Sequence, residues 1–351
     1  MSLKDINRRH LYLVSLYWNR YAVRSGSGLM FLMIALVFGL TVAHVVLTPV
    51  EMIQRQQKRE GLPADPEKIV ETISNLAEPV LRWALNIESG ENETISPITP
   101  PSQPFSQPQP DQPLPGMELQ SDERPGPAAR AGGLAGQPDR SSTDEWTTFL
   151  LYDRPALLSA IFLILLFGMP FLIPFLAFNQ VSGDVQSRGL RYVLLRTERS
   201  NIVLGRFIGT AVFSAAVTVV IIATITFYIG VKIRIYPAGE LTMWALHAFC
   251  ALAFLMLPYI AVCSMISATV DSPFLSLVLT QLVIGGMPLL VLIGSLAWKP
   301  AVYLKYSLPW GVQNYLLHPN PLYCVGAVLA LLGYTALFLG VGYWRFETRD
   351  L

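Results

Sequence analysis

The chain has 351 residues, of which 52% are hydrophobic and only 14% are charged, and its formal net charge is +1 at pH 7. Soluble domains usually carry about 25% charged residues, so this composition excludes an ordinary soluble domain and favours a membrane protein. The near-zero net charge gives no reason to expect nucleic acid as a partner. The sequence contains no GxxxxGKS/T phosphate-binding loop, so nucleotide hydrolysis is not assigned to this chain.

Residues 1–27 predict an amphipathic helix that lies at the cytoplasmic membrane surface. Apolar and aromatic residues, among them Leu13, Tyr17 and Tyr21, fall on one helical face, whereas Arg8 and Arg20 lie elsewhere on the helix. A plain surface anchor explains this pattern as well as a functional helix does.

Six windows are apolar and long enough to cross about 30 Å of hydrocarbon, which takes roughly 20 residues. The first window is too long and too far from the N-terminus for a cleaved signal peptide, so we expect a retained helix. Between the fourth and fifth windows, Ser272 suits a helix N-cap and Pro273 suits the first helical turn, so a new helix is expected to begin there. The windows are approximately 28–48, 156–178, 208–229, 241–264, 274–297 and 323–343.

Lysines and arginines of the short loops gather on one side of the membrane. By the positive-inside rule this side is cytoplasmic, and both termini are expected on it. We expect the protein itself to reside in the cytoplasmic (inner) membrane. Residues 49–155 then form a large extracytoplasmic loop between the first two membrane helices. Within it, residues 96–140 hold eleven prolines and predict a disordered linker.

The connection between the second and third windows, residues 179–206, interleaves apolar side chains with several arginines. A short amphipathic helix of this kind suits docking against a cytoplasmic partner. A basic connector that simply follows the positive-inside rule explains the arginines equally well.

This connection resembles the one found in type 2 permeases of ATP-binding cassette (ABC) transporters, the ABC-2 family. Arg206 stands where the family often has Lys, Leu190 stands where a Thr often follows the Gly, and the usual Pro before the Arg is absent. The C-terminal residues 343–351 also resemble the family's Phe-x-x-Arg-Asp-Leu ending. The matching residues are Asp184, Gly189, Leu190, Leu194, Leu195, Arg199, Ile202, Leu204 and Gly205.

The resemblance implies that 179–206 contains a coupling helix, which docks into a separate ATPase subunit and passes ATP-driven closure to the membrane helices. It implies a permease subunit of an exporter that works as a dimer, with a second copy or a paralogue. The chain itself would bind no cofactor and would not be an enzyme, because the partner uses the ATP. The candidate contacts with the ATPase are Asp184, Arg188, Gly189, Arg191, Arg196, Arg199, Gly205 and Arg206.

Pro170 and Pro174 near the end of the second window are hinge candidates, since each proline removes a backbone hydrogen bond; a static kink explains them too. No charged residue lies deep in any window, which counts against an ion-coupled transporter. The three cysteines lack metal-ligand spacing, so no metal site is expected.

The aromatic residues between the fifth and sixth windows, Trp310 among them, suit a belt at the outer interface, and the ABC-2 family often has short re-entrant helices there. Two other functions stay open: a membrane-anchored interaction protein that acts through residues 49–155, and a transporter that works without ATP. The substrate, the direction of transport and the choice between homodimer and heterodimer are open as well.

Overall fold

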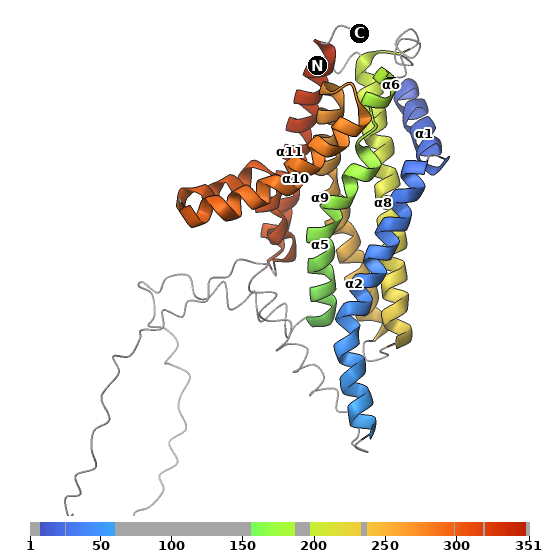
Figure 1. Cartoon of the computed structure of the whole chain (residues 1–351). Coiled ribbons are helices and arrows are strands. Elements are labelled where there is room, and N and C mark those ends of the chain that lie inside the picture. The colour runs from blue at the N-terminus through green and yellow to red at the C-terminus, as the bar shows by residue number, and fades with distance from the viewer. Residues whose placement is uncertain are drawn as a thin grey trace, which may run out of the picture.

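The computed structural model describes residues 8–24, 26–59, 156–186, 197–232, 237–297, 299–318 and 320–348. The expected all-α fold is confirmed, because these residues form helices joined by short connections, with no strand among them (Figure 1). In chain order the elements are α1 (Arg8–Arg24), α2 (Gly26–Arg59), α5 (Ala156–Ala177), α6 (Ser182–Gln186), α8 (Arg199–Lys232), α9 (Ala238–Thr269), α10 (Pro273–Ala297), the 3₁₀ helices η3 (Lys299–Ser307), η4 (Pro309–Gly311) and η5 (Gln313–Leu317), and α11 (Pro321–Glu347).

Six of the described helices are long and apolar enough to cross a membrane, as the sequence predicted. Several extend well beyond their hydropathy windows: α8 has 34 residues, or about 51 Å at 1.5 Å per residue, which exceeds the hydrocarbon thickness. The helices are longer than the windows because their ends are polar. A hydropathy window stops at the first polar residues, whereas the helix continues through them. The six spans are Gly26–Pro49, Leu158–Gln186, Arg199–Lys232, Ala238–Thr269, Pro273–Val291 and Pro321–Glu347.

The break between the fourth and fifth spans lies where the sequence placed it. Helix α9 ends at Thr269, Val270 is extended with ψ 141°, and α10 begins at Pro273. The backbone N–H of Ser276 donates to the carbonyl of Ser272 at 3.0 Å, which starts the new helix. Proline at this first position loses no hydrogen bond that the helix needs.

Helices α5 and α9 form the centre of the bundle. In their most apolar windows 61% and 67% of the residues are buried, against 17% in α10 and in α11. Figure 1 shows α2 and α8 on one side of this centre, with α10 and α11 on the other. The last part of α10 and η3 pack together and extend sideways from the bundle.

The segment from η4 to η5 re-enters the bundle instead of staying at its end. The Trp310 ring lies 5.2 Å from that of Phe167 and 6.2 Å from that of Phe171, in edge contacts. These two phenylalanines lie about 16 to 23 Å along α5, which is about 33 Å long. Trp310 therefore packs against the middle of α5, and its place in an aromatic belt at the outer interface stays a prediction.

Candidate functional site

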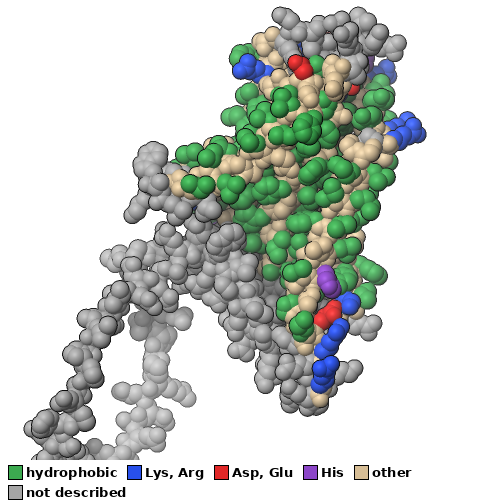
Figure 2. All heavy atoms as spheres, in the orientation of Figure 1, with side chains coloured by type: hydrophobic (Ala, Val, Ile, Leu, Met, Phe, Trp, Pro, Cys, Tyr) green, Lys and Arg blue, Asp and Glu red, His purple; other side chains and the backbone are tan. Residues whose placement is uncertain are grey.

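Five segments of the chain meet at one end of the bundle: α1, the α5–α6 connection, the first turns of α8, and the last turns of α9 and α11 (Figure 1). We call this the α6 end. On the face shown in Figure 2, hydrophobic side chains cover the middle of the bundle, and Lys, Arg, Asp and Glu gather toward its ends. A polar network at the α6 end is thus separated from the apolar middle.

Arg206 in the second turn of α8 is the centre of this network. Its side chain is 8% exposed and forms an ion pair with Asp184, whose side chain is 38% exposed. The Nη2 group donates to the Asp184 carboxylate, and the Nη1 group donates to the backbone carbonyl of Gln180. The guanidinium also lies 5.3 Å from the centre of the Trp18 ring. One arginine therefore joins α8 to α6, to the α5–α6 connection and to α1.

Thr210, one turn further along α8, collects three more hydrogen bonds. Its hydroxyl oxygen accepts from the Trp18 indole N–H at 2.8 Å and from the Gln180 amide at 2.9 Å, and it donates to the Arg206 carbonyl at 2.9 Å. Thr210 and Gln180 are fully buried. Buried hydrogen bonds of this kind stabilise one arrangement of the helices, because a lost partner leaves a buried polar group unpaired.

Two glycines one turn apart let α1 approach α8 closely. A Cβ on Gly205 would lie 2.7 Å from Val14 Cγ1 and 2.8 Å from Val14 Cβ, and one on Gly209 would lie 3.0 Å from the Ser15 carbonyl oxygen. This Gly-x-x-x-Gly spacing is the small-residue pattern that brings membrane helices together. The face of α1 that packs inward holds Ser15 and Trp18.

The predicted apolar face of α1 points outward at Leu13, which is 58% exposed, and at Tyr17, which is 70% exposed. An exposed apolar face beside exposed Arg9 and Arg20 is suited to a membrane interface. Of the predicted helix at residues 1–27, Arg8–Arg24 are helical, and the role of this helix as an interfacial elbow stays a prediction.

Ser267 near the end of α9 fixes the start of α6. Its fully buried hydroxyl accepts from the backbone N–H groups of Val181 at 2.9 Å and Ser182 at 3.0 Å. It also donates to the Ser182 hydroxyl at 3.2 Å, which in turn donates to the Phe178 carbonyl at 3.1 Å. These bonds satisfy backbone donors that a helix start otherwise leaves unpaired.

Arg199 connects α8 to the end of α11. Its Nη1 group donates to the carbonyls of Phe346 at 3.1 Å and Glu347 at 2.7 Å, which are among the last carbonyls of α11. The Phe346 ring, fully buried, completes a small apolar cluster under this contact. The cluster comprises Val181, Ile202, Val203, Ala268 and Phe346.

Comparison with protein families identifies the chain. Residues 20–351 match the family described as ABC-2 family transporter protein, and this range includes every element of the α6 end apart from the first part of α1. The chain belongs to the ABC-2 family. A search of curated proteins found no match. The family assignment and the six apolar helices make this a multi-pass membrane component of the ABC transporter type.

The structure places the predicted contact residues of this ABC-2 chain in three different settings. Arg188, Gly189, Arg191 and Arg196 lie outside the described residues. Arg199 and Gly205 contact α11 and α1. Asp184 and Arg206 pair with each other.

Arg206 lies just before the predicted 208–229 window, seven residues into α8 and about 10 Å from the first residue of that helix. Among the described residues, Arg206 is the one charged side chain that is buried. The hinge candidates Pro170 and Pro174 lie inside α5, which is continuous through both positions.

The residues that sequence reasoning missed are Trp18, Gln180, Thr210 and Ser267. The Gly-x-x-x-Gly spacing of Gly205 and Gly209 was the available signal, because it marks the face on which another helix packs. The spacing does not indicate which helix packs on this face. That helix is α1, whose Trp18 is 192 residues away from Thr210 in the sequence.

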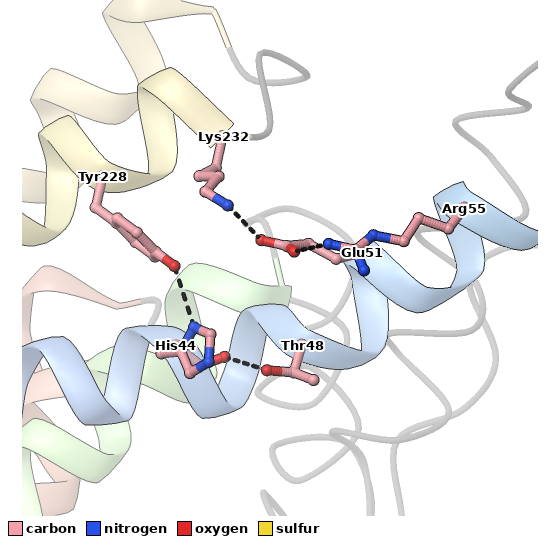
Figure 3. A network of polar contacts seen from close by, with 6 residues as sticks. All are labelled: His44, Thr48, Glu51, Arg55, Tyr228 and Lys232. Atoms are coloured by element: carbon pink, nitrogen blue, oxygen red, sulfur yellow. Dashed lines mark hydrogen bonds and ion pairs between the residues drawn. The ribbon is translucent and has the colours of Figure 1, made fainter. Parts of the chain in front are cut away.

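At the opposite end of the bundle a second polar network joins α2 to α8 (Figure 3). His44 Nδ1 lies 3.2 Å from the Tyr228 hydroxyl, and Glu51 pairs with Lys232 at 3.2 Å and with Arg55 at 3.4 Å. Lys232 and Arg55 are well exposed, at 46% and 77% of their side chains. Exposed pairs of this kind contribute at most about 1 kcal/mol, so the Glu51 network stabilises the contact of α2 with α8 only weakly.

Proposed function

We propose that the chain is the membrane-spanning permease subunit of an ABC exporter. The observation that carries the proposal is the ABC-2 family match over residues 20–351. In this proposal two permease subunits, identical or paralogous, form the translocation pathway in the inner membrane. A separate ATPase subunit supplies the energy, and this chain binds no cofactor.

The ATPase docks at the α6 end, which faces the cytoplasm in this proposal. Residues 187–196 connect α6 to the start of α8 and carry Arg188, Arg191 and Arg196. Both flanks of this connection are anchored, by Ser267 on α9 and by Arg199 on α11. Anchored flanks support coupling, because a displacement of the connection is passed to packed helices instead of being absorbed by a slack loop.

The orientation follows from the charges of the N-terminal part. Arg9, Arg20 and Arg24 are exposed on α1, which packs at the α6 end, and arginines near span ends favour the cytoplasmic side. Export is the direction that the family resemblance implies. In the same orientation, the Glu51 network lies at the extracytoplasmic end, and it includes the first residues of the 49–155 segment, where α2 continues to Arg59.

Affinity purification of the native chain from mild detergent tests the proposal. The variant carries Arg188→Glu, Arg191→Glu and Arg196→Glu together, and the control carries Arg20→Glu and Arg24→Glu on the exposed face of α1. Arg199 stays unchanged, because its replacement would unpair the carbonyls of α11. We expect an ABC ATPase to copurify with the wild type and the control, and to be lost with the folded triple variant.

A wild-type chain that brings down no ATPase, under conditions that keep other membrane complexes intact, refutes the proposal. Deleting residues 96–140 separates it from the interaction-protein alternative. A permease keeps its ATPase without this segment, whereas a protein that acts through its outer loop loses its partner.

A further inference from the structure

Arg206 is unsuited to a direct contact with another subunit, whereas its partner Asp184 is partly exposed. The Arg206 side chain is 8% exposed, and each of its two Nη groups already donates to an acceptor. Its guanidinium carbon lies over the Trp18 ring, 5.3 Å from the ring centre. A subunit that bound Arg206 directly would have to separate this partly buried ion pair, and the charge left behind makes such a step costly.

The same contacts make Arg206 a junction between segments that are far apart in the sequence. We define the Arg206 junction as Trp18, Gln180, Asp184, Arg206 and Thr210. Trp18 belongs to α1, Gln180 to the α5–α6 connection, Asp184 to α6, and the other two residues to α8. Every member is bonded to at least one residue on a different segment.

The chemistry of the junction favours a stiff connection. The planar guanidinium donates through two separate nitrogens in a fixed fork, which a lysine cannot reproduce. The Thr210 hydroxyl is shared by the Trp18 and Gln180 side chains. A displacement of α6 therefore moves the Asp184 carboxylate and the Gln180 carbonyl together. Both accept hydrogen bonds from Arg206, which also contacts Trp18 of α1.

We infer that Asp184 and Arg206 are positioning residues, which pass a displacement of the 187–196 connection to α1 and α8 together. They do not contact the ATPase. This inference deepens the proposed function and rests on it for the source of the displacement. The mechanical link itself belongs to this chain alone, so it can be measured without any ATPase.

Hydrogen–deuterium exchange on the purified full-length chain tests the link. The variants are Asp184→Asn, which keeps the size and removes the charge, and Arg206→Lys, which keeps the charge and removes the fork. The control is Glu51→Gln, which breaks an ion pair between α2 and α8 at the opposite end. We expect amide exchange in both variants to be about tenfold faster in residues 181–186 and also in α1. This factor corresponds to the loss of one hydrogen bond to a charged group. The control leaves both regions unchanged.

Faster exchange confined to residues 181–186, or unchanged in both regions, overturns the link. Rescue is the second criterion: Asp184→Glu restores a carboxylate and is expected to exchange within about threefold of the wild type, as its ion pair is re-formed. If amide exchange is as fast in Asp184→Glu as in Asp184→Asn, packing and not charge accounts for the effect, and the inference fails.

The complex with the ATPase separates positioning from contact. We expect Asp184→Asn to copurify with as much ATPase as the wild type, while permease-dependent ATP hydrolysis falls about tenfold, in line with the local opening. Loss of ATPase binding by a folded Asp184→Asn chain would make Asp184 a contact residue and overturn the inference. If the wild type itself binds no ATPase, the proposed function fails, and the exchange experiment still decides whether the link exists.

Discussion

Gly205→Ala tests whether the close approach of α1 to α8 depends on the absence of a side chain at residue 205. The new Cβ would lie 2.8 Å from Val14 Cβ, whereas carbon atoms pack at about 3.5 Å or more. Val14 Cβ is fixed to the backbone, so no rotation of Val14 relieves the overlap. Helix α1 has to retreat by about 0.7 Å, the difference between these two separations.

A retreat of this size also stretches the bond from Trp18 to Thr210, which is 2.8 Å long. At about 3.5 Å the N–H···O contact is outside the usual range. Overpacking costs about 1–3 kcal/mol, the lost hydrogen bond costs about 1 kcal/mol, and alanine in a helix returns up to about 1 kcal/mol. The net expectation is a loss of about 1–3 kcal/mol.

Thermal unfolding of the purified chain in mild detergent measures this loss, with Gly333→Ala as the matched control. Gly333 lies in the middle of α11, and a Cβ there meets nothing within 4 Å. Its replacement gains helix propensity alone, so we expect a slightly higher unfolding midpoint for Gly333→Ala and a clearly lower one for Gly205→Ala. Two midpoints that rise together would refute the close packing of α1 on α8.

The structure predicts the direction in which three further substitutions change the thermal midpoint or the rate of amide exchange. Gln313→Leu is expected to raise the thermal midpoint, because Gln313 is fully buried and neither of its amide atoms has a partner; burying such a group costs about 1–3 kcal/mol. A lower midpoint would show that the amide is paired. Arg199→Gln removes the cation from two carbonyls of α11 and should speed amide exchange in the last turn of α11; unchanged exchange there contradicts the capping role. Ser267→Ala leaves two buried N–H groups without their acceptor, so exchange at Val181 and Ser182 should rise, while Ser276→Ala, whose hydroxyl has no partner, should leave it unchanged.

Hydropathy predicted the six spans because crossing hydrocarbon depends on length and apolar composition, both of which are local properties of the sequence. The break at Ser272 and Pro273 was predictable for the same reason, since capping depends on neighbouring residues. Neither prediction needed the position of another helix.

The α6 end was less predictable because its contacts join residues that are distant in the sequence. The resemblance of residues 179–206 to the coupling connection of ABC-2 permeases grouped Arg206 with Arg191 and Arg196 as contacts for a partner. The inward position of Arg206 depends on Trp18 and Gln180, and only the folded chain brings these three together. Trp310 shows the same limit, since its packing on Phe167 of α5 joins residues that are distant in the sequence.

The two polar networks differ in a way that bears on how the bundle moves. At the α6 end the junction is largely buried and holds α1, α6 and α8, with α9 and α11 attached through Ser267 and Arg199. At the opposite end the Glu51 network joins only α2 to α8 and is largely exposed. Movement that enters at the α6 end is therefore expected to carry the helices joined there as one body, while the weak Glu51 network lets α2 and α8 separate at the opposite end. Such an arrangement suits a permease in which ATP-driven displacement on one side opens the other.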